Sequence, residues 1–90
     1  MAKRMLVTPP VGSVWIKEAA KQTGVSASRL RVWELRYGFP QPGFASNGYR
    51  VYTPYEIEQI KRVAALAADG ALIQEAVDAV LQDAALTKPF

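Results

Sequence analysis

The stretch from Ser26 to Tyr52 constrains the fold of this chain more than any other. It joins a short basic helix to a loop that is basic, aromatic and interrupted by glycine and proline. Gly24 before the helix and Gly38 after it are typical helix ends, because glycine readily takes the left-handed conformation found there. Pro40 and Pro42 prevent the helix from resuming. With a preceding helix, this pattern predicts a helix-turn-helix unit.

Length and composition limit the other possibilities. Ninety residues, half of them hydrophobic, suffice for one domain with a small core. The sequence has no cysteine and no histidine, which excludes disulfides, cysteine-rich zinc sites and histidine acid/base catalysis. We predict no cofactor, no metal site and no catalytic residue. No apolar run approaches the ~20 residues of a membrane span, so we expect a cytoplasmic, nucleoid-associated protein.

Charge divides the chain into two unlike halves. Residues 1–52 carry eight cations and two anions, whereas residues 53–90 carry three cations and six anions. A net charge of +6 followed by −3 suggests that the first half faces a polyanion and the second faces solvent or a protein.

Periodicity and capping residues predict four helices and a hairpin. The helices are expected at residues 16–22, 27–37, 54–69 and 72–84, with Thr53, Pro54 and Glu56 forming a capping box and first turn. Asn47-Gly48 predicts a two-residue turn, because both residues tolerate positive φ. Its strands are expected at residues 44–45 and 49–52. Residues 1–13 are expected to be a flexible leader, 14–85 the domain and 86–90 a frayed tail.

Two phrases in this order, GVSASRLRVWELRYGFPQP and NGYRVYTPYEIEQIKRV, resemble the DNA-binding domain of the MerR family of transcription regulators. The likeness runs from about residue 15 to 81, and LRVWELRYGFP is similar to the subgroup that carries cobalamin-type light-sensing domains. The resemblance implies a mainly α, winged helix-turn-helix fold. It also implies that helix 27–37 enters the major groove, that the hairpin is a wing on the flanking backbone, and that a homodimer binds a near-palindromic operator.

Two features depart from the family pattern. Phe44 stands about where relatives commonly have an arginine in the wing, so we expect a lost phosphate contact, or a role of the phenylalanine in packing or in contact with a partner. The chain also ends near the fourth helix, without a long dimerisation helix or an effector domain. We therefore expect either an excised domain or a stand-alone DNA binder.

The candidate DNA-binding residues lie on the first two helices and the wing. Arginines suit phosphates and guanine edges, and residues near the start of a second helix reach bases most easily. Wing residues are expected on phosphate, with Asn47 and Gly48 offering backbone N–H groups. The candidates are Lys17, Ser28, Arg29, Arg31, Arg36, Tyr37, Asn47, Gly48, Tyr49 and Arg50.

Several neighbouring residues have structural interpretations. Trp33 shares a face with Leu30 and is expected in the core. Tyr52 is expected to pack under the wing and Tyr49 to be exposed. Glu34 either pairs with Arg31 or Arg36, or holds one of them in position, or is simply solvated. For Tyr37 a core role remains open, and Trp15, if exposed, suggests a partner contact.

Two other functions remain open. The fold could serve as a protein-interaction module whose basic helix faces an acidic, DNA-mimicking protein, or as an excisionase-like architectural factor. Leu66, Leu72, Val80 and Leu81 could either close the core or present an apolar face for a dimer or another protein.

Overall fold

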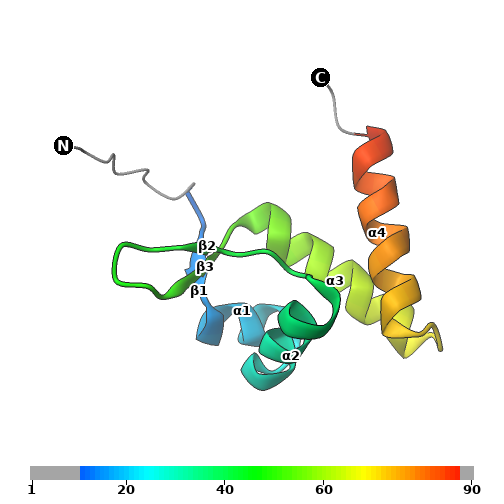
Figure 1. Ribbon diagram of the computed structural model, residues 1–90, viewed down its shortest axis with the longest axis horizontal. Helices are drawn as coiled ribbons and strands as arrows, with labels where there is room; N and C mark the ends of the chain where they lie inside the picture. Colours follow the sequence, from blue (N-terminus) through cyan, green and yellow to red (C-terminus); the bar gives the residue numbers. More distant parts are fainter. Residues whose placement is uncertain (1–10, 88–90) are drawn as a thin grey trace.

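The structure is a computed structural model that describes the backbone of residues 11–87 and the side chains of residues 11–83. The helices and strands, in chain order, are β1 (Val14–Trp15), α1 (Ile16–Thr23), α2 (Ala27–Tyr37), β2 (Gly43–Phe44), β3 (Arg50–Tyr52), α3 (Pro54–Ala68) and α4 (Ile73–Thr87). Four helices and a small antiparallel sheet make up the domain, and the sheet lies near α1, at the opposite end of α3 from α4 (Figure 1). The predicted fold class, a mainly α winged helix-turn-helix with four helices, is confirmed.

The capping residues set the helix boundaries largely as the sequence predicts. Ser26 caps α2 because its hydroxyl accepts a hydrogen bond from the Arg29 amide, at 3.1 Å. Thr53 and Glu56 form both halves of the capping box of α3, with distances of 2.9 and 3.1 Å. Helix α2 has the predicted bounds, α1 extends one residue further than expected, and α4 begins one residue later than expected and continues to Thr87.

Strand β1 was missed by the sequence prediction, which assigned no strand before the first helix. It pairs antiparallel with β3, Val14 opposite Tyr52 and Trp15 opposite Val51, and β2 pairs with the other edge of β3. Two residues are too short to show an alternating pattern, so only the neighbouring strand identifies them as β-structure. This third strand anchors the hairpin to the body of the domain.

The turn at the tip of the wing differs from the predicted two-residue type. The Gly48 amide donates to the Ala45 carbonyl at 2.8 Å, and the Ala45 amide donates to the Tyr49 carbonyl at 2.9 Å. Gly48 has a φ of 85°, and among the described residues no residue other than glycine has a positive φ. The loop is therefore a three-residue turn with glycine in the left-handed position, and Asn47 keeps an ordinary backbone conformation.

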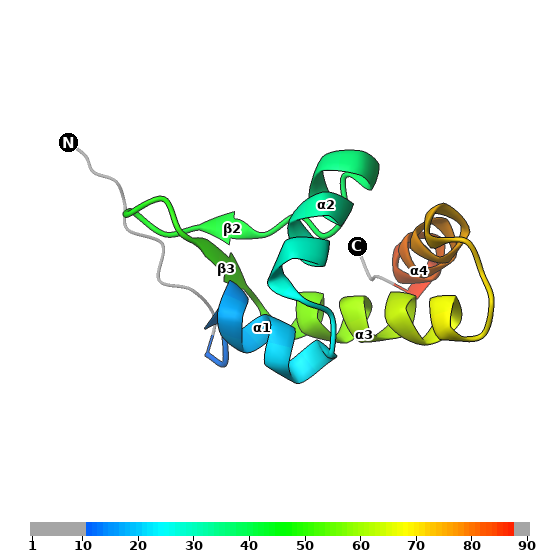
Figure 2. The same ribbon diagram turned by 90° about the horizontal axis from the view of Figure 1, so that it is seen from below.

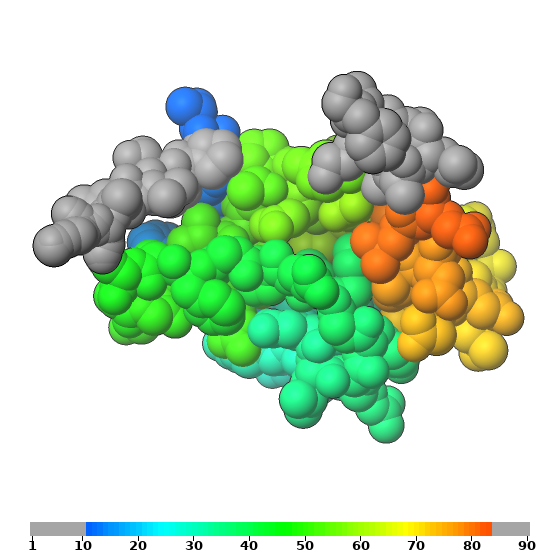
Figure 3. Space-filling view, turned by 45° about the horizontal axis from the view of Figure 1, so that its top comes forward, coloured from blue at the N-terminus to red at the C-terminus, as the bar shows by residue number. Residues whose placement is uncertain are grey.

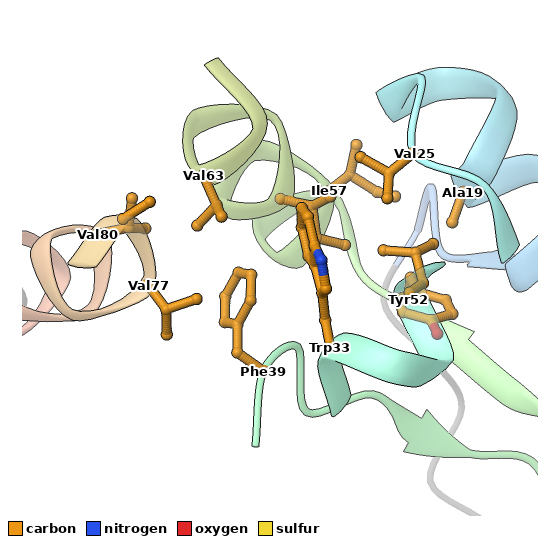
Figure 4. Packing of buried hydrophobic residues seen from close by; sticks show 12 residues of the cluster. Ala19, Val25, Trp33, Phe39, Tyr52, Ile57, Val63, Val77 and Val80 are labelled. Atoms are coloured by element: carbon orange, nitrogen blue, oxygen red, sulfur yellow. The ribbon is translucent and has the colours of Figure 1, made fainter. Parts of the chain in front are cut away.

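The core is built around α3, and α1, α2, β3 and α4 all contribute buried side chains to it. Trp33 lies near its centre, with Phe39 on one side and Tyr52 on the other, and Val77 and Val80 of α4 lie beyond Phe39 (Figure 4). Trp33 is 4% exposed and Tyr52 is fully buried, which confirms the core role predicted for both. Val80 also joins the core, whereas Leu66, Leu72 and Leu81 remain exposed.

The wing and α4 lie at opposite ends of α3, with α2 between them (Figure 2). In the face seen in Figure 3, the atoms of the wing and of α2 form one continuous surface. Residues 1–10 and 88–90, which include most of the predicted leader and tail, lie outside the described residues. None of the helices in the described part of the chain is long and apolar enough to span a membrane.

Candidate DNA-binding surface

The exposed side of α2 carries three arginines. Leu30 and Trp33 turn towards the core, so Ser28, Arg29, Arg31 and Arg36 all fall on the solvent side and are exposed. A residue advances about 100° around a helix, which places Arg36 about 140° from Arg31. The arginines therefore border the two edges of the exposed face, Arg31 on one side, Arg29 and Arg36 on the other.

An ion pair connects α2 to the wing. Arg50 of β3 donates from Nε to Glu34 Oε1 of α2 at 2.7 Å, across 16 residues of sequence. This hydrogen bond raises the pKa of Arg50 above its usual value, so the guanidinium stays charged. The prediction that Glu34 pairs with Arg31 or Arg36 is wrong: on the helix, Glu34 points towards the wing, and the hairpin brings Arg50 to it.

Phe44 lies on the exposed side of the wing, with its ring against Arg50. Its ring is 59% exposed, and the Arg50 guanidinium carbon lies 5.7 Å from the ring centroid. A cation held over an aromatic face at this distance is stabilised by the ring's quadrupole. Arg50 is thus fixed from two directions, by Glu34 and by Phe44.

A shallow hollow of about 240 Å³ lies between α2, the start of α1 and the wing. Arg31 and Arg50 both line it, so these two cations from distant parts of the sequence share one side of the molecule. Its aromatic wall consists of Trp15 and Tyr49, whose rings meet edge to face with centroids 6.0 Å apart. Trp15 is half exposed and Tyr49 is 65% exposed, which confirms the predicted exposure of Tyr49.

The backbone amides at the wing tip are largely used within the turn. The Gly48 amide bonds to Ala45, and the Asn47 side-chain oxygen accepts from the Tyr49 amide at 3.0 Å. The expectation that Gly48 offers its N–H to a phosphate is therefore wrong in this conformation. Both residues are exposed, so their other atoms remain accessible.

The two remaining candidates have different surroundings. Tyr37 is half buried and packs against the core, which supports its structural interpretation. Lys17 is exposed in the first turn of α1, next to Ile16, a lining residue of the hollow.

Tyr52 lies beneath the wing with its hydroxyl buried. Among the described residues this hydroxyl has no hydrogen-bond partner. Burial is the main cause that raises the pKa of Tyr52 to about 12, and the nearby Glu34 carboxylate adds to the effect. The phenol is consequently neutral at any physiological pH.

Sequence reasoning missed two apolar side chains on the exposed face of α2. Leu35 is 86% exposed and Val32 is 47% exposed. Both fall between Arg31 and Arg36 around the helix. The available signal was their position opposite Leu30 and Trp33, the residues that were assigned to the core.

A helix-turn-helix with a wing, whose second helix exposes arginines beside a cationic wing residue, defines the DNA-binding domain of a transcription regulator. The chain belongs to the MerR HTH family of regulatory proteins, whose family model matches residues 14–82. This family of regulators binds double-stranded DNA.

Individual relatives agree with the family assignment. The chain is 44% identical over 64 residues to the HTH-type transcriptional repressor CarA of Myxococcus xanthus, covering 69% of this chain and 22% of CarA. It is 38% identical over 61 residues to the repressor CarH of the same organism, covering 68% of this chain and 20% of CarH. The chain thus spans about a fifth of the length of these relatives. The solution structure of the N-terminal domain of the CarA repressor matches with a TM-score of 0.62 and 35% identity, covering 87% of this chain and 94% of that domain.

Proposed function

We propose that this chain binds double-stranded DNA sequence-specifically, with α2 in the major groove and the wing on the phosphate backbone. The observation that carries the proposal is that Arg31 of α2 and Arg50 of the wing line the same hollow. Glu34, which is the one acidic residue between Glu18 and Glu56, is paired with Arg50, so the two charges compensate each other. The uncompensated positive charge of this face comes from Arg29, Arg31 and Arg36 of α2, and it matches the closely spaced negative charges of a duplex backbone.

The residues divide into two roles in this proposal. Those near the start of α2 reach base edges, since this part of the second helix approaches bases in helix-turn-helix complexes. The others position the protein on phosphates and sugars. We assign Ser28, Arg29 and Arg31 to the first role, and Lys17, Arg36, Tyr37, Asn47, Tyr49 and Arg50 to the second.

The assembly follows from the same proposal. We propose residues 14–85 as the DNA-binding unit, acting by binding alone and without catalysis, and paired as a homodimer on a palindromic site. Three exposed leucines support a protein contact through this part of the domain: Leu66 of α3, Leu81 of α4, and Leu72 in the connection between them. Because the proposed ligand is chromosomal DNA, we place the protein in the cytoplasm at the nucleoid.

The test begins with selection of duplexes from a random-sequence library, followed by titration of the selected duplex at several salt concentrations. If a dimer makes six phosphate contacts, log K should fall with log salt at a slope of about −5. Arg31→Ala should nearly abolish binding while the circular dichroism spectrum stays unchanged. The matched control is Arg62→Ala on α3, because Arg62 is exposed, pairs with Asp83 and lies outside the hollow.

Three outcomes would contradict the proposal. They are a flat response to salt, failure of the selection to enrich any sequence, and unchanged affinity of Arg31→Ala. A ladder of cooperative complexes on long DNA would indicate an architectural factor instead. Capture of a protein that duplex DNA does not displace would indicate an interaction module.

A further inference from the structure

The middle of the exposed face of α2 is apolar. Leu35 is the most exposed large hydrophobic residue of any helix in the described part of the chain, and Val32 lies beside it. The core of the same helix is already complete, with Leu30 fully buried and Trp33 4% exposed. The two side chains therefore serve no packing role within the described domain.

The cationic surroundings indicate what covers this apolar strip. Around the helix axis, Leu35 lies about 40° beyond Arg31, and Val32 about 40° before Arg36. A strip bordered by arginines on both edges is matched to an apolar group that is itself bordered by negative charge. In the major groove, the only apolar group on a base edge is the C5 methyl of thymine, and phosphates flank it on both sides.

Contact between a leucine and the other bases would be unfavourable, which also favours thymine. Cytosine and guanine present hydrogen-bonding groups and no methyl group in the major groove. A leucine pressed against these groups removes water from them without replacing its hydrogen bonds, which is unfavourable. A thymine methyl group makes no hydrogen bond to water, so the same contact costs it none, and burial of its apolar surface is favourable.

We infer that Val32 and Leu35 read thymine methyl groups in the operator, and so are specificity-determining residues. The inference rests on the proposed function. The two residues are three apart, hence about 4.5 Å apart along the helix axis. This spacing corresponds to one or two base-pair steps of about 3.4 Å each. Each half-site should accordingly contain two thymines at adjacent or next-but-one positions, on either strand, beside the bases that the arginines contact.

The experiment replaces each thymine of the selected duplex by deoxyuridine, which removes the methyl group and leaves base pairing intact. Binding of the 90-residue chain is measured by fluorescence anisotropy at constant salt. Burial of one methyl-sized group corresponds to about a fourfold change in affinity, so one or two positions per half-site should weaken binding about fourfold. Elsewhere in the duplex deoxyuridine should have no effect.

Protein variants assign each methyl group to a side chain. Leu35→Ala should weaken binding to the thymine duplex and abolish the deoxyuridine effect at one position, and Val32→Ala should do so at the other. Alanine is a strong helix former and Leu35 is exposed, so α2 should remain folded. The control is Leu72→Ala, which removes an exposed leucine between α3 and α4 and should retain the full deoxyuridine pattern.

The possible failures are distinguishable. If a duplex is selected and bound with the expected salt dependence but no deoxyuridine weakens it, the inference is wrong and the proposed function stands. The same holds if Leu35→Ala binds DNA as tightly as the unaltered chain, which would assign the leucine to a protein contact. If no duplex is selected at all, the proposed function and the inference fail together.

Discussion

The ion pair between Glu34 and Arg50 should couple the stability of α2 to that of the wing. The perturbation is a double-mutant cycle with Glu34→Gln, Arg50→Gln and both together. Glutamine keeps the size of Glu34 and removes its charge. The contact of Arg50 with Phe44 is lost in both variants that change Arg50, so it cancels in the coupling energy.

The structure sets the expected magnitude. The two groups meet at 2.7 Å, and their side chains are 31% and 25% exposed, which is intermediate between surface and buried pairs. Exposed pairs contribute up to about 1 kcal/mol and charge-assisted hydrogen bonds about 1.5–3 kcal/mol. We therefore expect a coupling energy of about 1 kcal/mol, or a shift in Tm of about 4–8 °C for a domain of this size.

Urea denaturation followed by circular dichroism measures the four free energies of unfolding. The chain offers a matched control in Arg62 and Asp83, which meet at 2.6 Å but are 47% and 50% exposed. Because these groups are better solvated, their coupling should be less than half as large. Adding salt to about 1 M should reduce both couplings, since charges are then screened within about 3 Å.

Equal coupling energies for the two pairs would refute the argument from burial. A coupling energy below about 0.3 kcal/mol for Glu34 and Arg50 would show that the wing is held by its strand pairing with β1 instead.

Two further predictions concern stability. Because burial raises the pKa of Tyr52 to about 12 from its ordinary value near 10, the stabilisation from a neutral phenol is complete below pH 10 and lost as the pH rises to 12. Over that interval the unaltered chain should lose up to about 2.5 kcal/mol more than Tyr52→Phe, and parallel stability curves would contradict this assignment. At pH 7, Tyr52→Phe should be at least as stable as the unaltered chain, because the buried hydroxyl has no partner among the described residues. Thr53→Ala should destabilise the domain by about 1 kcal/mol in urea denaturation through loss of the capping box of α3, with Thr53→Ser as the control that keeps the hydroxyl, and equal losses for both variants would argue against capping.

The sequence by itself determined the local parts of this domain. Capping residues and helix-ending glycines act over three or four positions, so Ser26, Thr53 and Gly38 predicted the bounds of α2 and the start of α3. The three-residue spacing of Leu30 and Trp33 likewise predicted which side of α2 enters the core. Most of the candidate surface followed, because a residue opposite the core must face solvent.

Only the tertiary structure decided which contacts form between segments that are far apart in the sequence. Strand β1 exists because β3 offers a free edge, and two residues carry no pattern of their own. The sequence suggested Arg31 or Arg36 as partners of Glu34, whereas the path of the hairpin brings Arg50 to it. The hollow lined by Trp15, Arg31 and Tyr49 is likewise formed by three separate elements. Such contacts depend on how whole elements pack, which local sequence does not encode.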